Sequence, residues 1–349
     1  MAVAAASRDL RSHLFELMEQ RRIPGLQAAI VRNGAMVRLE ALGVANIEHD
    51  VPVTNASVFS INSIAQAFTG ISLLQLVEAN ALNIDAAIST YVEGLPEAWG
   101  RVTSRQLATL SSGLPEIVSY GSGNSIGLIG VDEEAAWGAA FALPIEFEPG
   151  TDYAFTRTNY ALLGKVIESL SGMDYTDFIR TRQFAVAGMT ETRFSDDRDL
   201  ISRRADSYSI VRPDGTSAEA LYKSHMNWPP VLHPVSGLHS TAQDLARWLI
   251  ALQAGTLLRE QSSLETLWRP GMRSSGQWEN WGIGWPVAQV EGHRVPAPAG
   301  GCKAQIALYP DGQAIVVLTN LIGAFPEQLA AYRDEAFDIG FMNELRTYC

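Results

Sequence analysis

The sequence predicts an α/β fold of the α+β kind, in which both ends of the chain build one antiparallel sheet flanked by helices. Short apolar runs separated by turn residues occur at 24–48 and again at 281–320, and such runs are typical of strands. Between them, residues 82–222 carry helical and loop patterns with few strand signals. These observations together predict a sheet that a helical insertion interrupts.

The first third of the chain predicts a helix, a hairpin and a second helix. Leu10, Leu14 and Leu17 share one helical face within residues 8–22. The stretch PGLQAAIVRNGAMVRLEALGVANIE then alternates apolar runs with NG and LG breaks, which indicates antiparallel strands. From Ser63 to Ala79 the apolar residues return to helical spacing, so a strong helix is expected there.

The rest of the chain completes the predicted fold. NYALLGKVIESLSG indicates an apolar helix that ends at a glycine. WGIGWPVAQVEG, KAQIALYP and QAIVVLTN indicate strands, with PDG as the hairpin turn between the last two, and a final amphipathic helix is expected from near Pro326. We therefore expect a discontinuous sheet domain (1–80 and 223–349), a helical domain (81–222) and a cleft between them.

Composition limits the class of protein. Of the 349 residues, 47% are apolar and 18% are charged, which is typical of a soluble globular protein. The net charge of −12 argues against a nucleic-acid partner, because phosphate binding needs clustered lysine and arginine. No apolar stretch approaches the length of a membrane span, residues 1–22 lack a signal-peptide pattern, and Cys302 and Cys349 do not suggest a disulfide framework. A cytoplasmic protein with no membrane partner is expected.

Five longer stretches carry more specific information: IPGLQAAIVRNG, VFSINSIAQAFTGISLLQLVEANALNID, VTSRQLATLSSGLPE, EPGTDYAFTRTNYALLGKVIESLSG and VSGLHSTAQDLARWL. In this order they resemble the serine β-lactamases of the class C type, with the related penicillin-binding proteins and esterases. The resemblance runs through nearly the whole chain. It implies a β-lactamase/transpeptidase-like fold with an active-site cleft between the two domains.

The resemblance places Ser63 at the nucleophile position of this family. The family's serine is followed three residues later by a lysine on the same helix face, and the lysine amine takes the hydroxyl proton. Here Gln66 occupies the lysine position. An amide has no useful basicity near pH 7, so it can hold a hydroxyl but cannot deprotonate it.

Two further family motifs are altered. In PGTDYAFTRTN, Phe155 occupies the position of a proton-relaying tyrosine and Arg157 that of an asparagine. In RVPAPAGGCK, either Val295 or Pro298 falls on the lysine or histidine position of the third motif, depending on where a gap is placed. Leu110 replaces another family histidine. Three losses together predict that the inherited acyl-transfer route is absent, because each acid or base group contributes orders of magnitude in rate.

The residues at these positions also have structural interpretations. Ser63 could serve as a helix-start residue, and Gln66 as a polar core residue bonded to Ser63 or to a backbone carbonyl. Phe155 is expected to pack and to make the pocket more apolar. Arg157 in a former active site needs either a protein carboxylate or an anionic ligand group, because an unpaired buried charge is costly.

Replacement bases are scarce in the sequence. His225 and His233 lie on a loop expected to border the pocket near Trp228, and they are the best candidates, although loop histidines more often form ordinary hydrogen bonds. Lys303 is the only lysine close to the third motif, and its alternative interpretation is an exposed lysine on the rim. No metal-ligand spacing and no glycine-rich phosphate loop occur, so neither a metal nor a cofactor is expected.

The first hypothesis is a β-lactamase-fold enzyme repurposed to a non-hydrolytic reaction on a small carbonyl-bearing metabolite in a biosynthetic pathway. The reaction would be a cyclisation, an isomerisation or a proton shift, which depends on positioning and hydrogen bonds. The predicted catalytic residues are Ser63, Gln66 and Arg157, and the predicted substrate-binding residues are Phe155, Trp228, His225 and Lys303.

Two alternatives remain open. The second hypothesis is a serine hydrolase in which His225, His233 or Lys303 activates Ser63. The third is a catalytically silent small-molecule-binding protein whose pocket side chains fill the former active site. The oligomeric state cannot be predicted from these residues.

Overall fold

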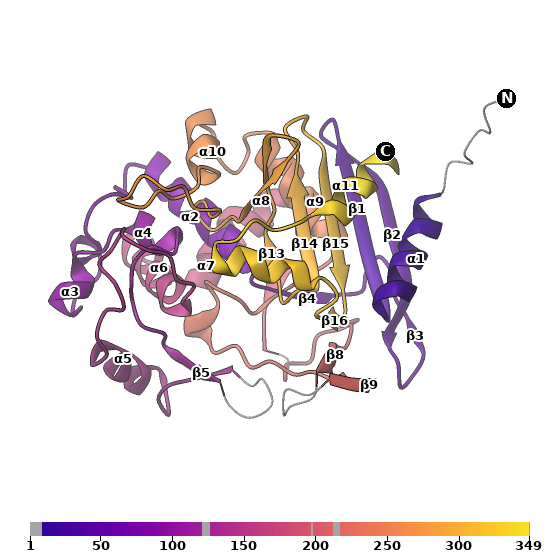
Figure 1. The fold of residues 1–349 in the computed structure, drawn as a ribbon, viewed down its shortest axis with the longest axis horizontal. Helices are drawn as coiled ribbons and strands as arrows, with labels where there is room; N and C mark the ends of the chain where they lie inside the picture. Colours follow the sequence, from indigo (N-terminus) through magenta and orange to yellow (C-terminus); the bar gives the residue numbers. More distant parts are fainter. Residues whose placement is uncertain (1–8, 121–125, 197, 212–216, 349) are drawn as a thin grey trace.

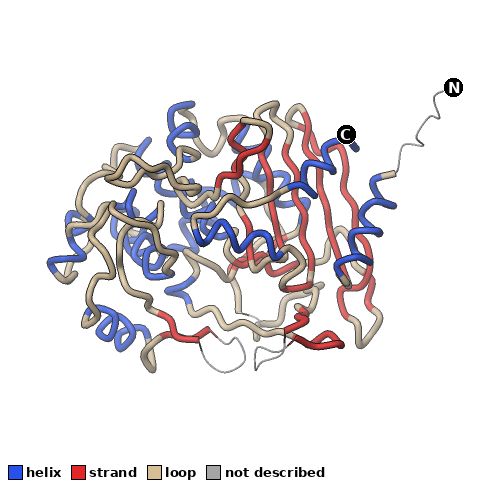
Figure 2. Tube along the Cα trace, viewed as in Figure 1, coloured by secondary structure: helices blue, strands red, loops and turns tan. Residues whose placement is uncertain are grey.

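The computed structural model describes residues 9–120, 126–196, 198–211 and 217–348. A six-stranded antiparallel sheet occupies one half of the molecule, with the strand order β13-β14-β15-β1-β2-β3 (Figure 1). Helices and loops make up most of the other half (Figure 2). The predicted fold class, an antiparallel sheet flanked by helices, is confirmed.

The two ends of the chain meet in the centre of this sheet. β1 (Gly25–Arg32) pairs with β2 (Ala35–Asn46) on one side and with β15 (Ala314–Thr319) on the other. Asn33 and Gly34 between β1 and β2 both have positive φ, as the tight turn of a hairpin requires. Residues of β1 and β15 are buried along almost their whole length, so this pair is the sheet's hydrophobic core.

The other strands follow the prediction only in part. β14 (Ala304–Leu308) forms the expected hairpin with β15, and β13 (Ala299–Gly300) lies at the edge of the sheet. β11 (Val287–Val290) and β12 (His293–Pro296) form a separate two-stranded hairpin. The strands of the middle region were not predicted, and four of them have only two to four residues, too few for a period-two pattern. They are β5 (Val118–Tyr120), β6 (Ile126–Leu128), β7 (Arg193–Phe194), β8 (Tyr208–Val211) and β9 (Ser217–Lys223).

The helix predicted from Ser63 begins slightly later, as α2 (Ala65–Glu78). It is buried on nearly every side, and Phe68 stacks on Trp248 of α9 (Ala242–Gln253) with ring centroids 3.9 Å apart. α6 (Arg157–Ser171) ends at Gly172 in the left-handed conformation, as predicted. None of the helices within the described ranges is long and apolar enough to cross a membrane.

The remaining elements are short. The helices are α1 (Leu10–Arg21), α3 (Glu97–Gly100), α4 (Ser104–Ala108), α5 (Glu133–Phe141), α7 (Tyr175–Ile179), α8 (Ala185–Ala187), α10 (Gln261–Leu267) and α11 (Gly340–Leu345). The other short segments are β3 (Val51–Pro52), β4 (Phe59–Asn62), β10 (Leu238–Ser240), β16 (Leu321–Ile322), η1 (Ile88–Thr90), η2 (Arg180–Phe184), η3 (Pro230–Leu232), η4 (Pro326–Arg333) and η5 (Arg346–Tyr348). β8 pairs with β16, next to the sheet, and the domain limits given above stay a prediction.

The C-terminal region corrects one prediction. Instead of one amphipathic helix from Pro326, the chain forms the 3-10 helix η4, stops at Asp334 with φ 56°, and resumes as α11. Contacts with distant elements override the local helical pattern, because Gln328 of η4 hydrogen-bonds to Gln305 of β14. We call residues 326–335 the C-terminal strap. The buried thiol of Cys302 is free, and Cys349 lies outside the described residues, as do residues 1–8.

Candidate active site

Ser63 lies in the turn that joins β4 to α2, where its side chain is partly exposed. The preceding Asn62 has φ 46°, a left-handed conformation that asparagine tolerates better than most residues. Gly300 of β13 packs directly on this turn. A Cβ atom at Gly300 would lie 1.9 Å from the carbonyl oxygen of Ile61 and 3.1 Å from the Ser63 nitrogen, so glycine is required. The edge of the sheet is therefore one wall beside Ser63.

Gln66 lies in the first turn of α2, three residues after Ser63 and 1% exposed. Among the residues that the structure describes, neither its Nε2 nor its Oε1 has a hydrogen-bond partner, so the predicted alternative of a bonded core residue is wrong. Leaving a buried polar group unpaired costs about 1–3 kcal/mol. Such an amide is a ready donor and acceptor for a polar group that enters the site.

Tyr332 of the C-terminal strap completes the surroundings of Ser63, and the sequence analysis missed it. Its hydroxyl lies within hydrogen-bonding reach of the Ser63 side chain and donates to the carbonyl oxygen of Ala299 over 3.2 Å. The phenol has one proton, which points to Ala299, so toward Ser63 the Tyr332 oxygen can act only as an acceptor. The chain of hydrogen bonds ends at a carbonyl, which cannot take a proton.

The protonation state of Tyr332 follows from its surroundings. Burial raises the pKa of Tyr332 well above its ordinary value, and the Ser63 hydrogen bond lowers that pKa only in part. The phenol is therefore neutral near pH 7. A neutral phenol donates hydrogen bonds but is no base for the Ser63 hydroxyl.

Phe155 packs against Tyr332, and Arg157 lies next to Phe155. The Phe155 ring meets the Tyr332 ring edge-on with centroids 4.9 Å apart, so the packing role predicted for Phe155 is confirmed. The Arg157 guanidinium donates to Glu116 over 3.0 Å and lies 5.4 Å from the Phe155 ring centroid. Of the two partners that Arg157 could have had, a protein carboxylate is present, so its charge is balanced without a ligand.

The third-motif region presents no base to Ser63. Val295 is buried within β12, and the carbonyl of Pro298 accepts a hydrogen bond from Ile306. The residue of β13 that packs on the Ser63 turn is Gly300, and Ala299 contributes its carbonyl oxygen. This wall of the site is therefore formed by backbone.

Lys303 is not the rim lysine that the sequence suggested. It is 2% exposed, and its Nζ donates to the hydroxyl of Ser207 over 3.0 Å. Its position directly after the β13 turn, at the start of the buried strand β14, carries the side chain into the interior.

The loop that carries His225 and His233 contacts the Ser63 turn through Met226. Asn62 donates to the sulfur of Met226 over 3.7 Å, whereas His225 is exposed. Trp228 is buried, and His233 stacks on Phe194 with centroids 5.2 Å apart. Burial lowers the pKa of His233 to about 4, so it is neutral near pH 7. Within the described residues, no hydrogen bond joins either histidine to Ser63.

A second feature that sequence reasoning missed is the anchor of the strap. Arg273 donates to Asp334 over 2.6 Å, and its Nε lies 3.8 Å from the Oε1 of Glu279. Burial, and then the nearby Asp334 charge, raise the pKa of Glu279 to about 8. Tyr153 adds a hydrogen bond to the carbonyl of Ala331, 2.9 Å long. No local sequence pattern predicts these contacts.

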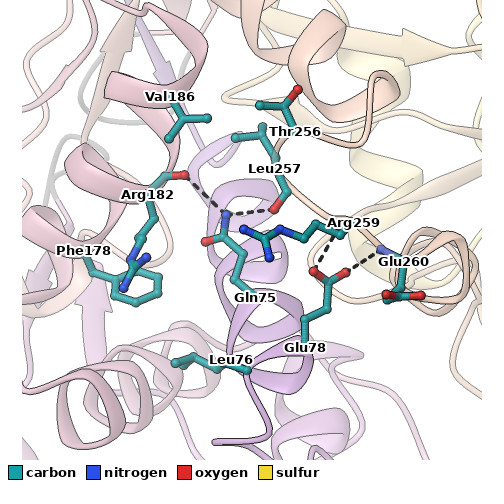
Figure 3. A pocket seen from close by; sticks show the side chains of 11 residues that line it. Gln75, Leu76, Glu78, Phe178, Arg182, Val186, Thr256, Leu257, Arg259 and Glu260 are labelled. Atoms are coloured by element: carbon teal, nitrogen blue, oxygen red, sulfur yellow. Dashed lines mark hydrogen bonds between the residues drawn. The ribbon is translucent and has the colours of Figure 1, made fainter.

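Several cavities of about 430 to 610 Å³ lie elsewhere, and Ser63 and Gln66 line none of these four. The one in Figure 3 surrounds the far end of α2. There Gln75 donates to the carbonyls of Leu257 and Arg182, and Glu78 accepts from the backbone of Arg259 and Glu260. These bonds tie the end of α2 to η2 and to the loop between α9 and α10, and the cavity is separate from the candidate site.

A serine between a short strand and a buried helix, beside the edge of a mainly antiparallel sheet, defines the class of fold used by serine β-lactamases and penicillin-binding proteins. The chain belongs to the beta-lactamase family, whose pattern matches residues 10–336. The family resemblance predicted from the sequence is confirmed.

Curated relatives agree with this assignment. Penicillin-binding protein 4* of Bacillus subtilis is 26% identical over 298 residues, which are 82% of this chain and 65% of the relative. Protein flp of Staphylococcus aureus is 24% identical over 66% of this chain and 46% of its own length. The chain thus spans less than two thirds of either relative.

Solved structures show the same fold. The octameric penicillin-binding protein homologue from Pyrococcus abyssi has a TM-score of 0.75 at 24% identity, over 94% of this chain and 77% of the other. The penicillin binding protein from Bacillus halodurans gives 0.70 at 25% identity, over 89% and 96%. The D-amino acid amidase from Ochrobactrum anthropi SV3 gives 0.73 at 21% identity, over 90% and 92%.

Proposed function

We propose that this chain is a β-lactamase-fold enzyme that binds a small carbonyl-bearing compound beside Ser63 and promotes a non-hydrolytic reaction on it. The observation that carries the proposal is Gln66, a buried amide with both polar atoms unbonded, one helical turn from Ser63. A ligand carbonyl accepts from the amide nitrogen, and a ligand N–H or O–H donates to the amide oxygen. Such a ligand removes the cost of the unpaired group.

The groups around Ser63 favour positioning over acyl transfer. Ser63, Gln66 and Tyr332 are neutral, and Arg157 is balanced by Glu116. Neutral donors polarise a carbonyl and hold it in one orientation, but they do not generate an alkoxide. A proton shift on carbon needs a base. Cyclisation or isomerisation of a hydrogen-bonded carbonyl compound therefore suits the site better. A place in a biosynthetic pathway and a cytoplasmic location belong to this proposal as well.

A serine hydrolase is the second candidate. Ser63 is partly exposed next to β13, and the amidase of similar fold is an enzyme. Fold likeness alone is a weak argument for activity. This candidate needs a base that reaches Ser63, and Lys303 and His233 are both engaged elsewhere.

A combined labelling and binding experiment separates the two candidates. The wild type and Ser63→Ala are treated with a fluorophosphonate probe and assayed for 4-nitrophenyl acetate turnover. In parallel, acetophenone and 2-pyrrolidinone are titrated into the wild type and Gln66→Leu and followed by NMR. Acetophenone matches the aromatic walls formed by Phe155 and Tyr332.

We expect no fluorophosphonate adduct on Ser63 and no ester turnover above that of Ser63→Ala. At least one carbonyl probe should bind the wild type, and Gln66→Leu should weaken that binding about three- to tenfold, the value of one or two hydrogen bonds. Stoichiometric labelling of Ser63 would establish the hydrolase instead. Absence of both labelling and probe binding would indicate a silent protein.

A further inference from the structure

The C-terminal strap crosses the edge of the sheet at the candidate site. In Figure 1 its short helix, η4, lies across the middle of the molecule beside β13 and β14. Tyr332 is near the end of this helix. Its hydroxyl bonds to Ala299, the neighbour of Gly300, which packs so closely on the Ser63 turn that a Cβ atom there would clash. The bond to Ala299 therefore places the phenol at the edge of the sheet beside the Ser63 turn, with Ser63 within reach of the same hydroxyl.

We propose that Tyr332 is a catalytic residue of this site, which donates a hydrogen bond to the carbonyl oxygen of the bound ligand. The inference rests on the proposed function and names one more residue that carries it out. It also gives the strap a role, because the strap supplies the phenol that Phe155 lacks.

The ring of Tyr332 is held for this task. Phe155 meets it edge-on at 4.9 Å, and Trp281 packs on it at 5.4 Å between centroids. Two aromatic neighbours restrict the rotation of the ring and leave the hydroxyl aimed at the space between Ser63 and β13. Donors held in advance of binding need no reorganisation when the ligand arrives.

A ligand can easily replace the Ala299 carbonyl as the acceptor of the Tyr332 hydroxyl proton. The bond to Ala299 is 3.2 Å long, beyond the usual 2.5–3.0 Å range for hydroxyl donors, so it is weak. A ligand carbonyl that enters beside Ser63 replaces Ala299 as the acceptor. The Tyr332 oxygen can then still accept a hydrogen bond from Ser63. That bond polarises the phenol and strengthens the bond from Tyr332 to the ligand carbonyl. No covalent bond forms, and each proton stays on its own oxygen.

The test compares Tyr332 of the strap with Tyr153, which donates a hydrogen bond to the strap from outside it. Tyr332→Phe removes the phenol oxygen and keeps the ring that packs on Phe155. Tyr153→Phe is the matched control, because it removes a strap hydrogen bond, to Ala331, without contact to Ser63. Each protein, with thermal melting as a check of folding, is titrated with acetophenone labelled with ¹³C at the carbonyl. The affinity and the carbonyl ¹³C shift are recorded.

We expect the bound carbonyl signal of the wild type to move downfield, as hydrogen bonding to the oxygen requires. Tyr332→Phe should weaken binding about three- to tenfold and remove most of the downfield shift. Tyr153→Phe should leave both values within twofold of the wild type. If the wild type binds acetophenone and Tyr332→Phe does so with equal affinity and equal shift, the inference is overturned while the proposed function stands. If acetophenone does not bind the wild type, the same comparison is made with 2-pyrrolidinone labelled with ¹³C at the carbonyl, and failure of the wild type to bind either probe overturns both.

Discussion

The helix α2 and the C-terminal strap both border Ser63, but they are held in place by different forces. α2 is buried on nearly every side and packs through apolar side chains such as Phe68. The strap has fewer buried residues, and polar contacts to Arg273, Tyr153 and Ala299 hold it. The serine and the amide thus come from the rigid core, and the phenol comes from a segment anchored by charges and hydrogen bonds.

This difference predicts distinct responses to mutation and pH. Apolar packing does not depend on protonation, so the position of α2 should be insensitive to pH. The strap anchor includes Glu279, whose raised pKa is within the experimental range. The four predictions below test the comparison, starting with the largest expected effect.

The largest effect is expected from truncation of the core side of α2. Phe68 is fully buried and stacked on Trp248, so Phe68→Ala should lower the free energy of unfolding by about 3–5 kcal/mol. Leu329 of the strap is 46% exposed, and Leu329→Ala should cost less than about 0.5 kcal/mol. Urea unfolding measures both variants. An equal loss of unfolding free energy in the two variants would show that the strap packs on the core as tightly as α2 does.

The strap should respond to pH through Glu279. The folded chain holds the Glu279 proton up to about pH 8, whereas the unfolded chain releases it near the ordinary value of 4.5. Between these values the folded state binds more protons, so stability falls as pH rises, by up to about 1 kcal/mol per pH unit. Glu279→Gln should flatten this slope in urea unfolding at pH 5 to 8.

Glu335→Gln is the matched control for this titration, because Glu335 belongs to the strap and is exposed. It should retain the wild-type slope. Hydrogen exchange should show faster opening of the strap at pH 8 than α2 shows, once the intrinsic pH effect is removed. Because the lowered pKa of His233 makes a contribution of opposite sign below about pH 6.5, the decisive quantity is the difference between variants, and equal slopes for the wild type and Glu279→Gln would contradict the assigned anchor.

We expect the Gln66 amide to contribute to ligand binding and to lower the stability of the fold. Gln66→Leu removes an unpaired buried amide and should raise the free energy of unfolding by about 1 kcal/mol. Gln183 is the matched control, since it is also buried against α2 but bonds to Phe68, Ser72 and Trp248. Gln183→Leu should lower stability by about 2 kcal/mol. Destabilisation of similar size by Gln66→Leu would mean that its amide has a partner.

The smallest effect is expected from restoring the lysine alone. Gln66→Lys should give no hydrolysis of 4-nitrophenyl esters or nitrocefin, because Phe155 cannot relay a proton and Arg157 opposes a second cation. Recovery should require Phe155→Tyr as well, together with Arg157→Asn. The single, double and triple variants are compared with the same changes on Ser63→Ala. Substantial turnover by Gln66→Lys alone would favour the serine hydrolase.

Much of the fold was predictable because its signals are local. The Asn33-Gly34 turn, the alternating apolar runs of β1, β14 and β15, and the glycine that ends α6 all act over a few residues. The family motifs also located Ser63, Gln66, Phe155 and Arg157, since motif spacing is read directly from the chain. The strap was predicted with the wrong structure, because its contacts with β13, β14 and the Arg273 loop override its helical pattern.

The sequence by itself determined the family and the order of the main strands and helices, and it predicted that Gln66 and Phe155 stand at the family's lysine and tyrosine positions. Only the tertiary structure decided which side chains meet: Tyr332 at Ser63, Glu116 at Arg157, and Lys303 at Ser207. The physical reason is that hydrogen-bond partners and burial depend on packing between segments far apart in the chain. Periodicity and turn residues encode elements, whereas the chemistry beside Ser63 is set by where the C-terminal strap comes to lie.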